Sequence, residues 1–341
     1  QPYVFSTWNI PFGVTVVISI FLVWLYTFRS GIKTIIWTDT IQAICLVAML
    51  IVIIWQVKDK LGLDMSGMVE AIGHDPHFRI FEFSDWHSTQ HFAKQFFSGI
   101  FITIVMTGLD QDMMQKNLSC KSLKDAQKNM YTYGFAFTPV NFLFLSLGVL
   151  LLILAGKEQI ALPAMSDDIL PMFCTSGILG NSILIFFTIG IIAAAFSSAD
   201  SALTALTTSF CIDILGVTHQ APKQAKKTRL KVHLLISVLF ALIIIIIKEV
   251  NNRSIIDAIY MIASYTYGPL LGLFVFGLFT QKHPRDKFVP YICIASPLIC
   301  FSTSYLVEKY IGYTFGYEML MLNGLITFMG LWLLSIKHQT K

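Results

Sequence analysis

The sequence predicts an all-α protein that crosses a lipid bilayer several times, because its residues are too apolar and too weakly charged for other classes. The chain has 341 residues, of which 55% are hydrophobic and 13% are charged. A soluble domain carries about 25% charged residues. The mean hydropathy is +0.68. This composition excludes a disordered chain and argues against an ordinary soluble enzyme. Strands of about ten residues with alternating polarity, which a membrane barrel requires, are absent from the sequence.

About nine segments are apolar enough to cross the bilayer as helices of about 20 residues. Together they form one transmembrane domain over residues 1–341. The chain opens at Gln1 without a signal-peptide pattern, so we expect it to be part of a longer protein. The nine predicted spans lie at roughly 10–28, 34–56, 95–114, 130–155, 179–214, 231–248, 254–279, 287–307 and 316–336.

The distribution of basic residues predicts the orientation of the spans. Sixteen of the 24 lysines and arginines fall in every second loop and in the carboxyl-terminal tail. Because cytoplasmic loops are enriched in Lys and Arg, we expect the carboxyl end inside the cell and the amino end outside. The formal net charge of +4 is too small to indicate a nucleic-acid partner. The lipid bilayer and a small solute are the expected partners, with no obligate protein partner.

Histidines and cysteines give no clear metal or disulfide pattern. The predicted outer loop 57–93 holds His74, His77, His87 and His91, whose spacings are compatible with a metal site but are also typical of a polar surface loop. The six cysteines are scattered and form no CxxC pair, so we expect them to be small core residues.

The fifth predicted span carries polar residues that are costly inside a membrane and therefore indicate function. At about 100° per residue, Ala194, Ser197, Ser198 and Ser201 share one arc, and Asp200 lies just beyond Ser197. Hydroxyl and carboxylate oxygens suit a hard cation such as sodium. The alternative is close packing of small residues. Packing does not require a carboxylate, so Asp200 favours the cation site.

Three other places carry polar groups in or beside a span. Asp39 follows Trp37 near the inner end of span two, where it either reaches the same cation or sits favourably in the first turn of a helix. Gly108 precedes a polar run in span three, as in a broken transporter helix or a helix that simply ends. Gly268-Pro269 predicts a kink in span seven, and Asp257 of that span either lies near the outer vestibule or only caps an exposed first turn.

These residues resemble the signatures of the sodium:solute symporter family, which is also called the sodium/glucose cotransporter family. The matching stretches are residues 31–42 with Trp37-Thr38-Asp39 and Gln42, residues 108–123 from Gly108-Leu109-Asp110-Gln111, and residues 193–213 with Ser197-Ser198 and Asp200-Ser201. The resemblance implies a LeuT-like fold of two inverted five-helix repeats. By this match the chain starts at core helix four and lacks the first core helices.

The resemblance also implies sites. A first sodium site would use the positions of Ala194, Ser197 and Ser198, together with carbonyl oxygens of the missing first core helix. A second sodium site, present in some members, would use Asp39, Ser197, Asp200 and Ser201. Because ligands from the missing helices are needed, we expect that this chain alone cannot transport.

The solute candidates are Thr103, Met106, Asp257 and Met261. Sugar-transporting relatives place an Asn and a gating Tyr on the sixth core helix, where this chain has Thr103 and Met106. This departure argues against glucose-like recognition and names no other solute.

The sequence therefore predicts a secondary active transporter of the cell membrane, in which sodium drives inward movement of a small polar organic solute. The alternatives are a proton-coupled symporter, in which Asp39 or Asp200 titrates, and a membrane solute sensor of the same fold. An enzyme is not expected, because no nucleophile–base or metal constellation lies within the predicted spans.

Overall fold

The computed structural model describes residues 10–28, 32–250 and 255–336, and of residues 32–35, 249–250, 255–258 and 336 only the backbone. The chain forms two compact units. The first comprises Gln1–Phe78 and Gln111–Asn252, and the second comprises Arg79–Asp110 and Arg253–Lys341. The prediction of one transporter domain over the whole chain is not tested by this division.

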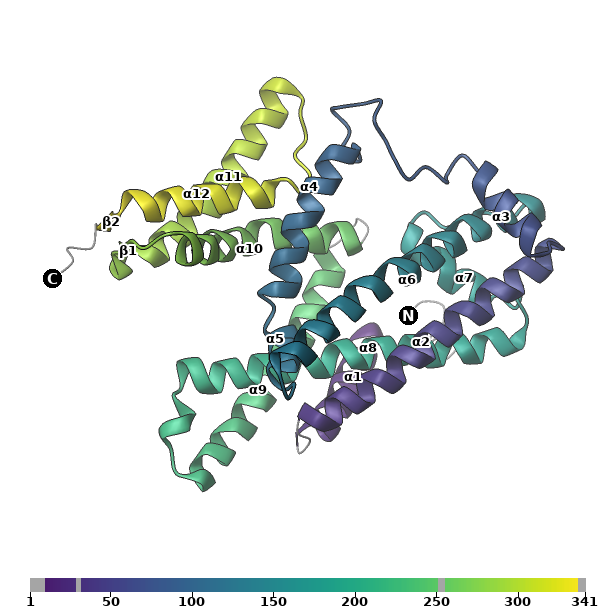
Figure 1. Cartoon of the computed structure of the whole chain (residues 1–341). Coiled ribbons are helices and arrows are strands. Elements are labelled where there is room, and N and C mark those ends of the chain that lie inside the picture. The colour runs from purple at the N-terminus through teal and green to yellow at the C-terminus, as the bar shows by residue number, and fades with distance from the viewer. Residues whose placement is uncertain (1–9, 29–31, 251–254, 337–341) are drawn as a thin grey trace. The chain divides into compact units, whose positions relative to one another are not determined.

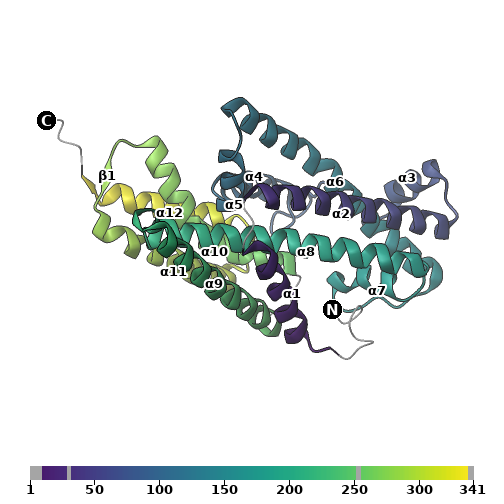
Figure 2. The same ribbon diagram turned by 90° about the horizontal axis from the view of Figure 1, so that it is seen from below.

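Helix α8 is the central element of the first unit. It contacts α1, α2, α5, α7 and α9, and Figures 1 and 2 both show α2 and α8 side by side. The helices of this unit are α1 (Phe12–Thr27), α2 (Ile32–Leu61), α3 (Met65–His74), α5 (Gln111–Leu118), α6 (Leu123–Glu158), α7 (Ile169–Thr175), α8 (Asn181–Ser209) and α9 (Pro222–Val250).

Two apolar clusters hold α8 in place. On one side, Ile53 of α2, Leu150 of α6 and Phe173 of α7 are completely buried with Phe187 of α8. On the other side, α1 and α9 pack around Leu203. In lipid such packing stabilises mainly through van der Waals contact, because the surrounding acyl chains are equally apolar.

The second unit is built on the pair α10 (Ile255–Phe279) and α12 (Met319–Leu333). Helix α11 (Val289–Ile311) contacts both, and α4 (Phe92–Thr103), which continues into a π-helical turn at Ile104–Gly108, contacts α12. The short strands β1 (His283–Pro284) and β2 (Ser335–Ile336) pair antiparallel.

Asn323 of α12 compensates for a proline inside α10. Pro269 has no backbone N–H, so the carbonyl of Tyr265 four residues earlier cannot receive its helical hydrogen bond. The Asn323 side-chain amide donates to that carbonyl at 2.8 Å and to the carbonyl of Ser264 at 3.1 Å. Gly268 allows this approach, since a Cβ there would overlap the Asn323 side chain. Helix α10 therefore continues across Pro269.

We expect Asn323→Leu to lower the melting temperature by several degrees. The substitution leaves the Tyr265 carbonyl of α10 without a donor and removes a second hydrogen bond from the Ser264 carbonyl, and an orphaned group costs about 1–3 kcal/mol. Thermal unfolding in detergent measures the effect. Ser302→Ala on α11 is the control, because among the described residues the Ser302 hydroxyl bonds to the Leu298 carbonyl of its own helix. Equal melting temperatures for the two variants would contradict this role of Asn323.

The number of nine spans is not confirmed. Among the described residues, six helices are long and apolar enough to cross a membrane, or seven if the interrupted helix at 92–118 counts as one span. The predicted spans 10–28 and 316–336 correspond to shorter apolar helices, Phe12–Thr27 and Met319–Leu333. They are shorter because Pro11 precedes the first helix and the second ends just before strand β2.

Several helices run past their apolar segments. Helix α6 begins at Leu123 rather than near 130, because the Ser122 hydroxyl caps it by accepting from the Asp125 amide at 3.2 Å. Helix α9 begins at Pro222 rather than near 231, since proline suits a first helical turn. Hydropathy shows which part of a helix is apolar enough to lie in the membrane, whereas capping residues decide where the helix begins.

The polar features outside the spans are local. In the loop before α4, His77 lies 2.8 Å from Asp75 and His87 lies 3.7 Å from Asp85. Over the described ranges no group of three His, Cys, Asp or Glu side chains gathers as a metal site. The hydroxyl of Ser66 and the amide of Gly67 hold the pKa of Asp64, which caps α3, below its usual range. All six cysteines are free thiols.

Candidate functional site

The predicted polar face of α8 meets Asp39 of α2. The Ser197 hydroxyl donates to Oδ1 of Asp39 at 2.7 Å, and the Ser201 hydroxyl lies 3.4 Å from Oδ2. The two serines are one helical turn apart, so both reach the same carboxylate. Asp39 is therefore bound to α8 by side-chain contacts.

Lys116 of α5 reaches the same carboxylate. Its ammonium nitrogen Nζ lies 2.8 Å from Oδ2 of Asp39 and 2.9 Å from Oδ2 of Asp112. It also donates to the Ser201 hydroxyl at 3.0 Å. All three ammonium protons thus have oxygen acceptors. We refer to Asp39, Asp112, Lys116, Ser197 and Ser201 as the Asp39 cluster.

Asp200 lies behind this cluster and is completely buried. Its Oδ2 accepts a hydrogen bond of 2.6 Å from the Tyr26 hydroxyl of α1. Its other oxygen, Oδ1, is buried and has no hydrogen-bond donor among the described residues. Oε1 of Gln42, which lies one turn after Asp39 on α2, is likewise buried without a donor there. Buried acceptor oxygens without donors favour a positively charged ligand.

The charges and donor atoms of this region fit a hard monovalent cation. Asp39, Asp112 and Asp200 provide carboxylates against the single ammonium of Lys116, while Ser197 and Ser201 add neutral oxygens. Such oxygen ligands are those that hard cations take. Among the described residues, no Cys or His side chain pairs with Asp39, Lys116, Ser197 or Ser201 as a transition-metal site would favour.

The remaining residues predicted for the first sodium site lie on an open part of α8. Ala194 is half-buried and Ser198 is exposed, whereas Ser197 is engaged with Asp39. The structure thus brings together Asp39, Ser197 and Ser201. It leaves Ala194 and Ser198 on the neighbouring surface of the same helix, and Asp200 faces Tyr26 instead.

The solute candidates all belong to the second unit. The exposed Thr103 donates its hydroxyl to the Gly99 carbonyl of its own helix at 2.8 Å. Met106 is half-buried within the π-helical turn, and Met261 on α10 is 42% exposed. The Asp257 side chain lies outside the described residues. Whether these residues form a solute site stays a prediction.

Sequence reasoning missed Lys116 and Tyr26. A signal existed for Lys116, because Asp112 and Lys116 stand four residues apart directly after the break at Gly108, as an ion pair on a helix does. No comparable signal marked Tyr26, which precedes its partner Asp200 by 174 positions. Only the packing of α1 against α8 reveals that pair.

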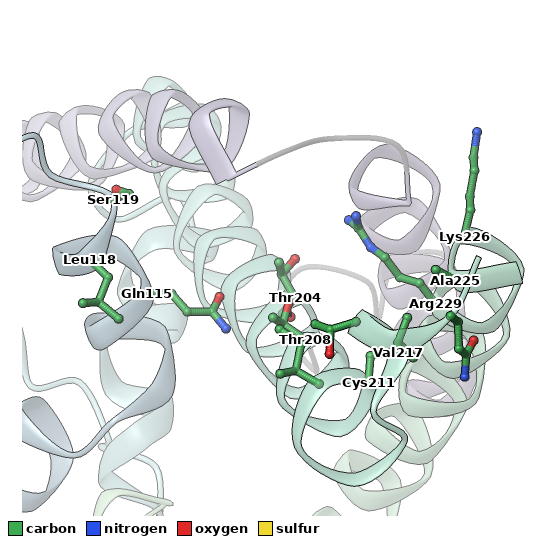
Figure 3. A pocket seen from close by; sticks show the side chains of 13 residues that line it. Gln115, Leu118, Ser119, Thr204, Thr208, Cys211, Val217, Ala225, Lys226 and Arg229 are labelled. Carbon is green, nitrogen blue, oxygen red and sulfur yellow. Dashed lines mark hydrogen bonds between the residues drawn. The ribbon is translucent and has the colours of Figure 1, made fainter. Parts of the chain in front are cut away.

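An open pocket of about 850 Å³ lies further along α8. Thr204 and Thr208 line it from α8, Gln115 from α5 and Arg229 from α9. Figure 3 shows Gln115 directed toward the two threonines and Lys226 extending away from them. Because Thr204 and Thr208 continue the helical face of Ser197 and Ser201, hydroxyls extend from the Asp39 cluster to this pocket.

The model of the sodium:solute symporter family matches residues 4–286. The chain belongs to the sodium:solute symporter family. Membership confirms the resemblance, and it places the chain in a family of transporters rather than enzymes, with sodium as the expected ion.

Two curated symporters are similar to the chain. The sodium/sialic acid symporter SiaT of Proteus mirabilis (strain HI4320) is 26% identical over 282 residues, which cover 80% of this chain and 56% of that protein. The sodium/sialic acid symporter NanT of Aliivibrio fischeri (strain ATCC 700601 / ES114) is 26% identical over 271 residues, which cover 76% of this chain and 52% of that protein. The chain therefore spans about half the length of these relatives.

The fold is similar to a solved structure of a Na⁺-coupled sialic acid symporter, which was determined in a substrate-bound outward-open state and is described as revealing a novel Na⁺ site. The TM-score is 0.76 at 21% identity, and the match covers 95% of this chain and 66% of that chain. This likeness confirms the predicted all-α transporter fold of this multi-pass membrane family.

Proposed function

We propose that the protein is a sodium-coupled symporter that carries sialic acid, or a similar acidic sugar, across the cell membrane. The observation that carries the proposal is the convergence of Ser197 and Ser201 of α8 on the Asp39 carboxylate of α2. A carboxylate held by two hydroxyls inside an apolar helix pair is costly unless it has a function. In a family of sodium symporters, that function is to bind sodium.

Sodium would occupy two sites on α8 in this proposal. Ala194, Ser197 and Ser198 form the protein side of the first site, and Asp39, Ser197, Asp200 and Ser201 form the second. The exposure of Ser198 supports the first site, because its hydroxyl is free to meet ligands from another segment. The buried Oδ1 of Asp200, which has no donor among the described residues, supports the second.

Sodium binding would drive solute movement through coupled equilibria. If sodium binds the outward-open state more tightly, it favours that state and completes the solute site, and the solute in turn increases sodium affinity. The open pocket beside Thr204 and Thr208 would receive the ion when the protein opens inward. Its walls include Arg229, and the first turns of α9 hold Lys223, Lys226 and Lys227, as cytoplasmic segments do.

The choice of solute follows from the relatives. SiaT and NanT are both named as sodium/sialic acid symporters, and Thr103 and Met106 stand where sugar-transporting members place an Asn and a Tyr. A proton-coupled symporter and a solute sensor are the competing functions. They differ from the proposal in requiring no sodium, so one measurement separates them.

We expect sodium to raise the melting temperature of the intact protein relative to potassium at equal ionic strength. A ligand at 100 times its dissociation constant stabilises a protein by about 2.7 kcal/mol. Ser198→Ala should reduce the sodium-specific shift by removing one ligand of the first site. Ser302→Ala, on an exposed face of α11, is the control. A wild-type protein that responds equally to sodium and potassium would contradict sodium coupling.

Uptake into proteoliposomes tests the solute. We expect an inward sodium gradient to drive accumulation of radiolabelled sialic acid by the full-length protein, and an equal potassium gradient to drive none. Uptake that follows a proton gradient without sodium would show the proton-coupled alternative. Sodium-driven uptake of another solute, with sialic acid inert, would retain the symport mechanism and exclude the proposed substrate.

A further inference from the structure

The Asp39 cluster already contains a cation, the ammonium group of Lys116. Its three donors reach Asp39, Asp112 and Ser201 at 2.8, 2.9 and 3.0 Å. Lysine is a compact point charge on a flexible stem, so it approaches oxygen ligands much as a metal ion does. Asp39 and Lys116 are both largely buried, with side-chain exposures of 19% and 25%.

We propose that Lys116 is an internal competitor for sodium at the Asp39 cluster. This inference rests on the proposed function, because it concerns the second sodium site. The lysine ammonium and a sodium ion would use the same oxygens of Asp39 and Ser201. Two positive charges at these distances repel each other strongly in a partly buried site. Sodium therefore binds there only when the ammonium withdraws.

The oxygens of the Asp39 cluster fall into two sets, so the ammonium of Lys116 can keep one acceptor after it leaves Asp39. Asp112 lies one turn before Lys116 on α5 and pairs with it along the same helix. Ser197 contacts Oδ1 of Asp39, away from the Oδ2 atom that Lys116 holds. Lys116 can thus leave Asp39 and Ser201 while keeping Asp112, and Ser197 stays with Asp39.

Exchange of the two cations would change the attachment of α5. With the ammonium in place, α5 is joined to α2 through Asp39 and to α8 through Ser201. With sodium in place, both attachments are released. Helix α5 follows directly on the break after Gly108. The lysine therefore links occupancy of the cation site to the freedom of the segment that follows the broken helix.

Equilibrium binding of radioactive sodium to the intact protein tests the competition. We expect Lys116→Met to lower the sodium dissociation constant at this site about tenfold, a typical size for coupling between two sites. Lys116→Arg keeps the positive charge and should not tighten sodium binding. Lys128→Met removes an exposed lysine of α6 and is the charge-matched control. Each variant is also made with Ser198→Ala, so that binding at the first site is suppressed.

The outcomes separate this inference from the proposed function. Tighter sodium binding in Lys116→Met, with no change in Lys128→Met, supports the competition. If only Lys116→Met binds sodium at this site, the ammonium never withdraws in the wild type, so both the exchange and the proposed second sodium site are wrong. If the wild type binds sodium and Lys116→Met binds it equally or more weakly, the inference is wrong while sodium coupling stands. If neither protein binds sodium, both are wrong.

Discussion

Asp39→Asn is expected to abolish sodium-driven uptake and to weaken sodium binding at the Asp39 cluster by at least tenfold. The substitution keeps the size of the side chain and a carbonyl oxygen for Ser197, but it removes the negative charge. Two unit charges about 4 Å apart attract by about 4 kcal/mol at an effective dielectric constant of 20. A third of that energy already corresponds to a tenfold change in affinity.

The same variant separates a cation ligand from a structural ion pair. Lys116 keeps Asp112 and Ser201 as acceptors after the substitution, so we expect the protein to fold and insert. Asp59→Asn removes an exposed carboxylate near the other end of α2 and should leave sodium binding unchanged. Wild-type sodium affinity in Asp39→Asn, measured with purified protein, would show that Asp39 only holds helices together.

The opposite signs expected for two neighbours make the test stringent. Asp39→Asn should lower sodium affinity, whereas Lys116→Met should raise it, although both substitutions break the same 2.8 Å ion pair. A general loss of packing would lower affinity in both variants. Only competition between the ammonium and sodium for one carboxylate gives opposite changes.

The polar cluster that we propose as a cation site was predictable from sequence where its residues lie on a single helix. Hydroxyls at Ser197 and Ser201 and a carboxylate at Asp200 stand out in an apolar span, because polar groups there are costly. Their helical spacing also predicted that Asp200 lies to one side of the serines. The structure agrees, since Asp200 faces Tyr26 while the serines face Asp39.

The parts of the site that depend on packing between distant helices were not predictable. Lys116 resembled one of several cytoplasmic lysines, and only the contact of α5 with α8 places it beside Asp39. The role of Asn323 was hidden for the same reason. Gly268-Pro269 predicted a kink, but the donor that satisfies the Tyr265 carbonyl comes from α12.

The ends of the helices are a third feature of the structure, and local polar residues determine where they lie. The apolar run of α6 starts near 130, yet the Ser122 cap begins the helix at Leu123. Hydropathy therefore located the spans but not their full helices. Hydropathy also predicted the segments of α1 and α2 alike as spans, although the helix α1 has 16 residues and the helix α2 has 30.

The position of Asp39 depends on a close contact between α2 and α8, about ten residues from the Asp39 cluster. Gly190 of α8 lies against Met49 of α2, and a Cβ at position 190 would overlap the Met49 side chain. Asp39 pairs with Ser197, whereas the later residue Met49 meets the earlier residue Gly190, so the two helices run antiparallel. This contact sets the separation of the helices that the Asp39–Ser197 bond requires.

Gly190→Ala is therefore expected to destabilise the protein and to weaken sodium binding together. Overpacking a closely packed contact costs about 1–3 kcal/mol, although alanine is usually the better residue inside a helix by about 0.5–1 kcal/mol. Gly148→Ala on α6 is the matched control, because nothing lies within 4 Å of a Cβ at that position. In Gly148→Ala only the higher helix propensity of alanine should act, so the stability of the protein should rise or stay constant.

A second substitution in α2 decides whether the overlap with Met49 is the cause. Met49→Ala alone leaves a cavity and lowers stability. Combined with Gly190→Ala it provides the space that the new methyl group needs, so the loss in the double variant should be smaller than the sum of the single losses. Additive losses of stability would show that Gly190→Ala does not act through the overlap with Met49. If stability recovers in the double variant and sodium affinity recovers with it, the spacing of α2 and α8 controls the cation site.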